Sequence, residues 1–472
     1  MNDLFERAPE IITAASSSNL GIVALMVIVF SAISFAFFRR SHEVWRLVSL
    51  VLLFAGCMAF GFAVFKSSAS EEVSARLSEH AQKLFVEAEA AKAAKTIVPG
   101  AALPSSLAKA RNDFEGTWRE ASLPERRKLD PKQAYMALSA VNGLHRIEEN
   151  DSSRQTDSTY WADESINYFR ELQNPRLLTE ALLDKAAIYL DIGQLGNDDR
   201  AQFERAAKEG DALMVAAYQT ADKDQKPTVL RITSRFYYNL ARPQSFRLSD
   251  NWDNNYLALA YDKALAASDL EPANIKNANQ LARSTIKLSK NPPQDSDPAW
   301  TSKLRNSQQR LKAAWTANRE DIVEAHPRLS ALNVLGVVTM ETIAREWHEL
   351  GPQARRTSQA RYLGELEVDS LAPLREAVAL LQTSELRKSY GFDLYYDIAR
   401  GHAVKIGLLR ISTTSAAAAD FENLKRNLLA ARENAKTSQL ESAIKDIGQE
   451  LTFGLLTVSQ RSQLVQLLSV GT

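Results

Sequence analysis

Three arginines and an asparagine follow one another along one predicted helix, in the stretch PTVLRITSRFYYNLARPQ. Arg231, Arg235, Asn239 and Arg242 recur at offsets of 0, 4, 8 and 11 residues. An α-helix has about 3.6 residues per turn, so these side chains share one side of it. Guanidinium groups bind carboxylates through two parallel hydrogen bonds. The spacing therefore predicts a surface that binds a peptide carboxylate or an acidic segment.

A second predicted helix carries the same chemistry at the same spacing. Asn279, Arg283 and Lys287 recur every four residues. If the helices stack as repeats, both sets line one concave groove that binds a protein or peptide partner. The alternative is a solvated polar face whose charges pair with neighbouring helices.

Aromatic residues gather in the stretch SYGFDLYYDIARGH. Tyr390, Phe392, Tyr395 and Tyr396 have a spacing that turns some of them toward the core and others away from it. Packing in the core is the expected role. Exposed members of the set would be anchors for a protein partner.

The histidines do not form a metal-ligand pattern. Glu346, His348 and Glu349 are close in sequence, but near neighbours on a helix point in different directions. No HExxH or HxxxH motif is present, and the single cysteine excludes cysteine-based zinc sites. We expect no metal and no cofactor.

Motifs that identify a reaction are also missing from the sequence. It contains no GxxxxGK[ST], GxGxxG or GxSxG pattern and no EF-hand loop. No catalytic residues are assigned. An enzyme that acts on cell-wall material stays open as a third reading, and it would require a deep pocket with paired, pKa-shifted carboxylates.

Charge and composition narrow the class of protein. Formal charge balances to +0 with a pI of about 7.0, which removes the electrostatic reason to expect a nucleic-acid partner. Only 18 Gly and 15 Pro occur in 472 residues, which disfavours a turn-rich all-β fold.

Two uncharged or nearly uncharged segments near the N-terminus have the length of membrane spans. Leu20 to Phe38 and Trp45 to Phe65 are joined by a short polar loop, so they are predicted to form an antiparallel transmembrane hairpin. The stretch LLFAGC resembles a lipoprotein cleavage site ending at Cys57. However, the apolar residues MAFGFAVF follow it, and they favour a continuous span.

The distribution of arginines predicts the orientation of the hairpin. Arg39, Arg40 and Arg46 flank or lie in the loop, whereas the tail of residues 1–19 is acidic. Cytoplasmic loops are enriched in Lys and Arg, so the loop is placed in the cytoplasm and both termini outside it. The large domain is then expected on the periplasmic side of the inner membrane.

Small residues line one side of the second span. Ala55, Ala59 and Ala63 recur every fourth residue, a spacing that lets another helix approach closely. Either the first span or the helix of a partner protein could occupy this face.

Residues 66–98 are predicted to continue the second span as a helical stalk. Leu77, Ala81, Leu84, Ala88 and Ala91 form a short heptad-like seam. The seam predicts either a homodimer through residues 73–91 or packing against the chain's own domain.

The remaining residues, 99–472, read as an all-α domain of stacked helical hairpins. Turn residues such as QNP, LEPAN and ELGPQ separate the helices. Helices are predicted near 106–120, 131–148, 157–172, 176–192, 198–218, 226–242, 252–269, 273–290, 298–318, 328–349, 369–384, 389–411, 417–435 and 437–468.

Two stretches resemble tetratricopeptide repeats. In residues 186–210, Phe203 and Ala206 match the aromatic-x-x-Ala of the second repeat helix. In residues 256–272, Tyr261 and Ala264 match the same pair. The resemblance implies an α-solenoid that binds a protein or peptide, although the spacing of successive first helices exceeds that of the family.

These observations together predict a membrane-anchored, non-catalytic scaffold or adaptor. Its partners would be a protein or peptide in the groove and the lipid bilayer at the hairpin. The alternative is a structural subunit of a membrane complex that is held mainly through the small-residue face of its transmembrane hairpin.

Overall fold

The computed structural model describes residues 43–94, 96–97, 101–149, 156–195, 199–243, 252–290, 300–381, 383–410 and 414–469. Within these ranges all regular structure is helical and no strand occurs, so the all-α prediction is confirmed. The predicted tail, the first span (20–38), Arg39 and Arg40 lie outside the described residues. The chain divides into two compact units, one up to Ala181 and the other from Leu182.

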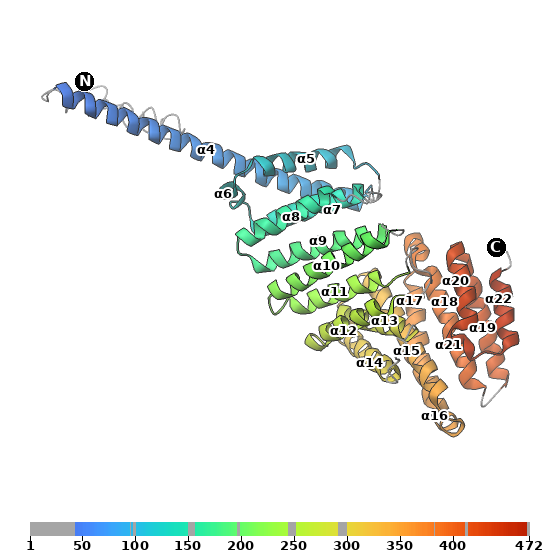
Figure 1. Ribbon diagram of the computed structural model, residues 1–472. Coiled ribbons are helices and arrows are strands. Elements are labelled where there is room, and N and C mark those ends of the chain that lie inside the picture. Colours follow the sequence, from blue (N-terminus) through green and yellow to red (C-terminus); the bar gives the residue numbers. More distant parts are fainter. Residues whose placement is uncertain are drawn as a thin grey trace. The chain divides into compact units, whose positions relative to one another are not determined.

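The first unit consists of one long helix and shorter helices beside it (Figure 1). The elements are α4 (Glu43–Ala93), α5 (Ser105–Glu120), α6 (Leu123–Arg126), α7 (Pro131–Glu148), α8 (Thr156–Glu171) and the start of α9 (Pro175–Leu195). Trp118, Phe114 and Phe169 are fully buried between them. Helix α7 begins where Asp130 accepts hydrogen bonds of 3.0 Å from the backbone N–H groups of Lys132 and Gln133.

Helix α4 contains the whole of the predicted second span, residues 45–65, and continues without a break as predicted. It ends at Ala93 rather than at residue 98. Ala55 is exposed on it, whereas the side chains of Arg46, Ala59 and Ala63 lie outside the described part of the chain. Among the residues that are described, no helix combines the length and the hydropathy that crossing a membrane requires.

The heptad-like seam of α4 faces the interior of its own unit. Leu77, Ala81, Leu84 and Ala91 are buried, and α5 and α7 pack against this part of the helix. The seam thus serves packing within the domain, the second of the two predicted uses. A dimer through residues 73–91 would have to use the other side of α4, where Phe85 and Val86 are exposed.

The second unit is a repeat-like array of paired helices. After the end of α9 its elements are α10 (Arg200–Thr220), α11 (Lys226–Leu240), α12 (Asn254–Leu270), α13 (Ile275–Lys290), α14 (Trp300–Asn318), α15 (Ala325–Glu349), α16 (Pro352–Glu365), η1 (Leu366–Leu371), α17 (Ala372–Ala379), α18 (Ser384–Leu409), α19 (Thr414–Glu433), α20 (Thr437–Gln449), α21 (Leu451–Gly454) and α22 (Val458–Ser469). From α10 to α15, each helix packs on the next along the chain.

The two stretches that resemble tetratricopeptide repeats supply buried aromatic and small residues, as the resemblance implies. Phe203 and Ala206 are buried on α10. Tyr261 and Ala264 are buried on α12, which ends two residues before Pro272. Both pairs therefore belong to the buried side of their helices, where Phe203 meets Tyr256 and Tyr261 meets Trp300 edge to face.

A π-helical turn, η1, connects α16 to α17. It brings Ser370 against α15, where the Ser370 hydroxyl donates a 2.8 Å hydrogen bond to the Gly336 carbonyl. A Cβ at Gly336 would lie only 2.5 Å from Leu374 Cγ. The close approach of these helices therefore requires glycine at this position. The prediction of one helix over 369–384 was wrong, because η1 and α17 share this range.

Helix α16 was not predicted, and the single helix predicted over 437–468 is divided into α20, α21 and α22. The first division falls at Glu450, which has an extended backbone (φ −72°, ψ 141°). This residue joins the buried ionic network described below, whose contacts outweigh the local helical propensity.

Candidate functional site

A hollow of about 430 Å³ in the second unit collects six of the seven residues predicted for the groove. It is lined by α11, α13, the first turns of α15, and Tyr390 of α18. The six residues are Arg231, Arg235, Asn239, Arg242, Asn279 and Arg283. The seventh, Lys287, does not line it.

The sequence folds these residues outward because the opposite sides of their helices are apolar. On α11, Leu230, Tyr237 and Leu240 are buried, as expected for the side away from the arginines. Asn274 precedes the first residue of α13, and its side chain accepts a 3.0 Å hydrogen bond from the Lys276 backbone N–H. Lys276 and Arg283 then follow at an interval of seven residues, two turns apart on one side.

The lining of the hollow is strongly cationic. Its charged members are Arg231, Arg235, Arg242, Lys276 and Arg283, and none of the described lining residues is Asp or Glu. Arg231, Arg235, Lys276 and Arg283 form no ion pair with any carboxylate that the structure describes. The alternative prediction, a face of ordinary ion pairs, does not describe these four residues.

Like charges crowd one another on α11. Burial and then the neighbouring Arg235 lower the pKa of Arg231, while Glu271 acts in the opposite direction. The side chain of Glu271 is itself held by Asn274 at 2.8 Å and Asn277 at 3.3 Å. An anion placed in the hollow would therefore relieve repulsion between Arg231 and Arg235 that Glu271 offsets only in part.

Ser330 of α15 orients two of the predicted groove residues. Its hydroxyl oxygen accepts hydrogen bonds from Arg283 Nη2 at 2.9 Å and from Asn279 Nδ2 at 3.0 Å. Both side chains are fixed by a neutral group, so the positive charge of Arg283 stays available to a ligand.

Tyr390 and His326 form an aromatic part of the same lining. The Tyr390 hydroxyl lies 2.8 Å from His326 Nδ1, and the two rings meet edge to face with centroids 5.3 Å apart. Among the predicted aromatic residues, Phe392 and Tyr396 are buried and stack at 5.5 Å, while Tyr390 and Tyr395 are only partly buried. The division into core and non-core members agrees with the prediction.

Lys287 lies on α13 beyond the hollow. Its ammonium group sits 4.9 Å from the centre of the Trp252 ring, a cation–π distance. Burial, followed by the charge of Lys290, lowers the pKa of Lys287. The structure therefore places this residue toward the buried ionic network rather than in the cationic lining.

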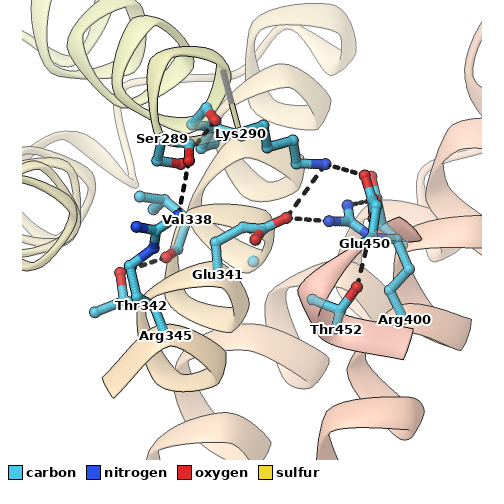
Figure 2. A network of polar contacts seen from close by, with 12 residues as sticks. Ser289, Lys290, Val338, Glu341, Thr342, Arg345, Arg400, Glu450 and Thr452 are labelled. Carbon is cyan, nitrogen blue, oxygen red and sulfur yellow. Dashed lines mark hydrogen bonds and ion pairs between the residues drawn. The ribbon is translucent and has the colours of Figure 1, made fainter. Parts of the chain in front are cut away.

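That network joins α13, α15 and α18 to the start of α21 (Figure 2). Arg400 bonds to Glu341 and, at 2.8 Å, to Asp397 Oδ1, and its Nε lies 2.9 Å from Glu450 Oε2. Lys290 pairs with Glu450 and lies 3.3 Å from Glu341 Oε1. Figure 2 shows Glu341 between the two cations.

Three carboxylates, those of Glu341, Asp397 and Glu450, contact the two cations Arg400 and Lys290, and Lys287 adds a further positive charge that acts on Glu450. Burial raises the pKa of Asp397 to about 6, against the opposing influence of Arg400. Burial acts in the same direction on Glu450, but Arg400 and Lys290 hold its pKa at about 2. Each carboxylate is engaged by a cation, which is typical of a structural network that holds helices in place.

The residues of the REWHEL stretch are used in packing. Glu346 pairs with Arg305 of α14 through Nη2 at 2.5 Å, and Glu349 accepts a 2.5 Å hydrogen bond from Thr301. The His348 backbone carbonyl accepts from Arg355 at 3.0 Å. Over the described ranges, no group of three or more His, Cys, Asp or Glu side chains is arranged to hold a metal ion.

Comparisons with known proteins give no family. The chain matches no protein-family model and no curated protein. Among solved structures it is similar to a "Circular tandem repeat protein with novel repeat topology and enhanced subunit contact surfaces" at 12% identity, with a TM-score of 0.30. That match covers 85% of this chain and 96% of the other. At this TM-score the likeness adds nothing to the helical repeats seen in the chain itself.

Sequence reasoning did not find Lys276, Ser330 and His326 as parts of the site. Lys276 stands seven residues before Arg283, and this interval was a usable signal. Ser330 and His326 come from α15, and no local pattern connects that helix to α11 or α13. Only the packing of α15 beside α13 brings them to the hollow.

Proposed function

We propose that this protein is a non-catalytic adaptor that holds an acidic segment of a protein partner in the cationic hollow. The observation that carries the proposal is a lining with five cations and no described Asp or Glu, in which Arg231, Arg235, Lys276 and Arg283 form no described ion pair. Arginine supplies four of the five, and its planar fork binds carboxylates bidentately. No Asp or Glu side chain of the described lining competes with such a ligand for the cations.

The residues around the hollow favour binding of a ligand over catalysis of a reaction. Four of its five cations lie on α11 and α13, which pack on each other and on α12, so few of its parts need ordering when a ligand binds. The described carboxylates with raised pKa values, Asp393, Asp397 and Asp446, do not line it. A cell-wall hydrolase would need such groups in the pocket itself.

We also propose that the N-terminal hairpin anchors the domain in the inner membrane with the domain on the periplasmic side. The support is the apolar sequence of residues 20–38 and 45–65 and the arginines between them. Val51, Phe54 and Met58 on α4 are 60%, 67% and 61% exposed, a row that is unfavourable in water. An anchor of this kind keeps the hollow close to membrane partners and raises its effective concentration there.

Site-specific photo-crosslinking in intact cells tests the adaptor role. A photoreactive phenylalanine replaces Tyr390, which lines the hollow without supplying one of its charges, or, as the control, Val368, which is 66% exposed and lines a separate hollow with α14 and α17. We expect a discrete crosslinked protein from position 390 that is absent from position 368. Its sequence, identified by mass spectrometry, should contain an acidic segment. Equal products from the two positions, or none from either, would contradict the proposal.

A further inference from the structure

Two arginines of the hollow form a pair with a fixed interval. Arg231 and Arg235 are one turn apart on α11, and both line the hollow. Four residues at about 1.5 Å each separate their backbone positions by about 6 Å. Neither pairs with a described carboxylate, so both are available to the same ligand.

An extended peptide matches this interval. In a strand, alternate side chains lie on the same face and are separated by about 6.6 Å. Carboxylates at positions i and i+2 of a ligand would therefore meet Arg231 and Arg235 in register. The side chain between them points away from α11, and the neighbouring helix α13 supplies Arg283 and Lys276 for it.

A helical ligand could also place carboxylates about 6 Å apart, at positions i and i+4, but it requires more room. An α-helix is about 10 Å wide with its side chains, whereas strands lie only about 4.8 Å from their neighbours. An extended segment is therefore the narrower ligand and requires less room between α11, α13 and α15.

The number of cations in the lining indicates how many carboxylates the ligand carries. A lone chain-terminal carboxylate neutralises one charge and leaves the remaining cations facing one another. Two or three acidic side chains on one segment offset the repulsion that Arg235 exerts on Arg231 and also reach Arg283, which Ser330 holds at 2.9 Å.

Building on the proposed function, we propose that the hollow binds an internal, extended acidic segment with carboxylates at alternate positions, read by Arg231 and Arg235 in register. The chain terminus of the partner is not required. Arg283 and Lys276 receive the side chain between the two acids.

Three end-blocked peptides of identical composition test the register against the purified full chain in detergent. Two aspartates are placed two, three or four residues apart in a Gly/Ser background, and binding is followed by fluorescence anisotropy at low salt. We expect the peptide with aspartates at i and i+2 to bind at least about fivefold more tightly than the other two. The charges are equal in all three, so general attraction cannot produce this order.

Two variants test whether Arg231 and Arg235 cause the preference for one peptide over the others. In R231Q/R235Q the preference for the i, i+2 peptide should disappear, whereas R356Q, an exposed arginine on α16, should keep it. Circular dichroism and the thermal midpoint verify that the double variant is folded.

The possible results separate this inference from the function on which it rests. Equal binding of all three peptides to the wild-type chain, lost in R231Q/R235Q, would overturn the register and leave the adaptor role standing. Failure of every acidic peptide to bind better than its asparagine counterpart would contradict both.

Discussion

The carboxyl group of Asp397 illustrates how one residue can make stability depend on pH. It lies in the buried ionic network of α13, α15 and α18, and it bonds to Arg400 at 2.8 Å. Burial raises its pKa to about 6, whereas an aspartate in an unfolded chain has a pKa of about 3.9. The folded protein therefore binds a proton at this site more readily than the unfolded chain does.

The free energy of unfolding should rise as pH falls from 7.5 to 5, because in this range the folded state takes up a proton at Asp397 that the unfolded chain binds only at lower pH. In the Asp397→Asn variant the side chain is neutral at every pH, as the protonated aspartate is at low pH. We expect this variant to be more stable than wild type at pH 7.5, by at most about 3 kcal/mol for a shift of about two pKa units. Urea denaturation at several pH values measures both effects.

Part of the pH dependence should survive the substitution. Burial also raises the pKa values of Asp393 and Asp446, which act in the same direction. Glu450, with a pKa of about 2, destabilises the fold only at lower pH, when it becomes protonated. An Asp397→Asn variant with the same stability and the same slope as wild type between pH 7.5 and 5 would contradict the assignment.

At the scale of elements, sequence periodicity located most helices well. The prediction for 131–148 coincides with α7, and that for 106–120 differs from α5 by one residue. Both helices have a clear apolar side, and α7 also has a strong start signal in Asp130 and Pro131. Helix α16 was missed because it buries little; Tyr362 is its one fully buried member among the described residues. Its Gly351-Pro352 start was the available signal.

Breaks that depend on distant contacts could not be predicted from local sequence. Glu450 interrupts a strongly helical stretch because its carboxylate reaches Lys290 and Arg400, far away in the chain. The π-helical turn η1 likewise depends on the contact of Ser370 with Gly336 of α15. Both features exist only once the helices have assembled.

The requirement for glycine at position 336 gives a prediction for η1. A methyl group there would collide with Leu374 and approach the Ser370 carbonyl oxygen at 3.0 Å. We expect Gly336→Ala to lower the free energy of unfolding by about 1–3 kcal/mol. The matched control is Gly364→Ala on α16, where no atom lies within 4 Å. It should be neutral or stabilising by up to about 1 kcal/mol. Chemical denaturation compares the two, and equal effects would show that the helices do not meet as described.

At the scale of the whole molecule, the sequence located most of the candidate site and left its surroundings undetermined. Regular offsets on α11 and α13 were enough to select Arg231, Arg235 and Arg283. Whether two helices share a hollow depends on their stacking, which periodicity does not specify. For the same reason, Lys287 continued the pattern in sequence but lies outside the lining.

The proposed anchor predicts the topology of the chain. Alkaline phosphatase is active only outside the cytoplasm, so its fusion to the C-terminus should be active, and the same fusion with green fluorescent protein should be dark. Replacing Arg39, Arg40 and Arg46 with glutamine should reduce phosphatase activity, because these residues set the orientation. A fluorescent fusion together with an inactive phosphatase would place the domain in the cytoplasm.

Binding of an acidic peptide to the cationic hollow is the most direct test of the account. Fluorescence anisotropy would compare an end-blocked glutamate-rich peptide with its glutamine counterpart on the full chain, on R231Q/R235Q and on R356Q. We expect the glutamate peptide to bind wild type and R356Q alike, to bind the double variant at least about tenfold more weakly, and to weaken with added salt. Equal binding of the glutamate and glutamine peptides, or an unchanged affinity in R231Q/R235Q, would contradict the proposed function.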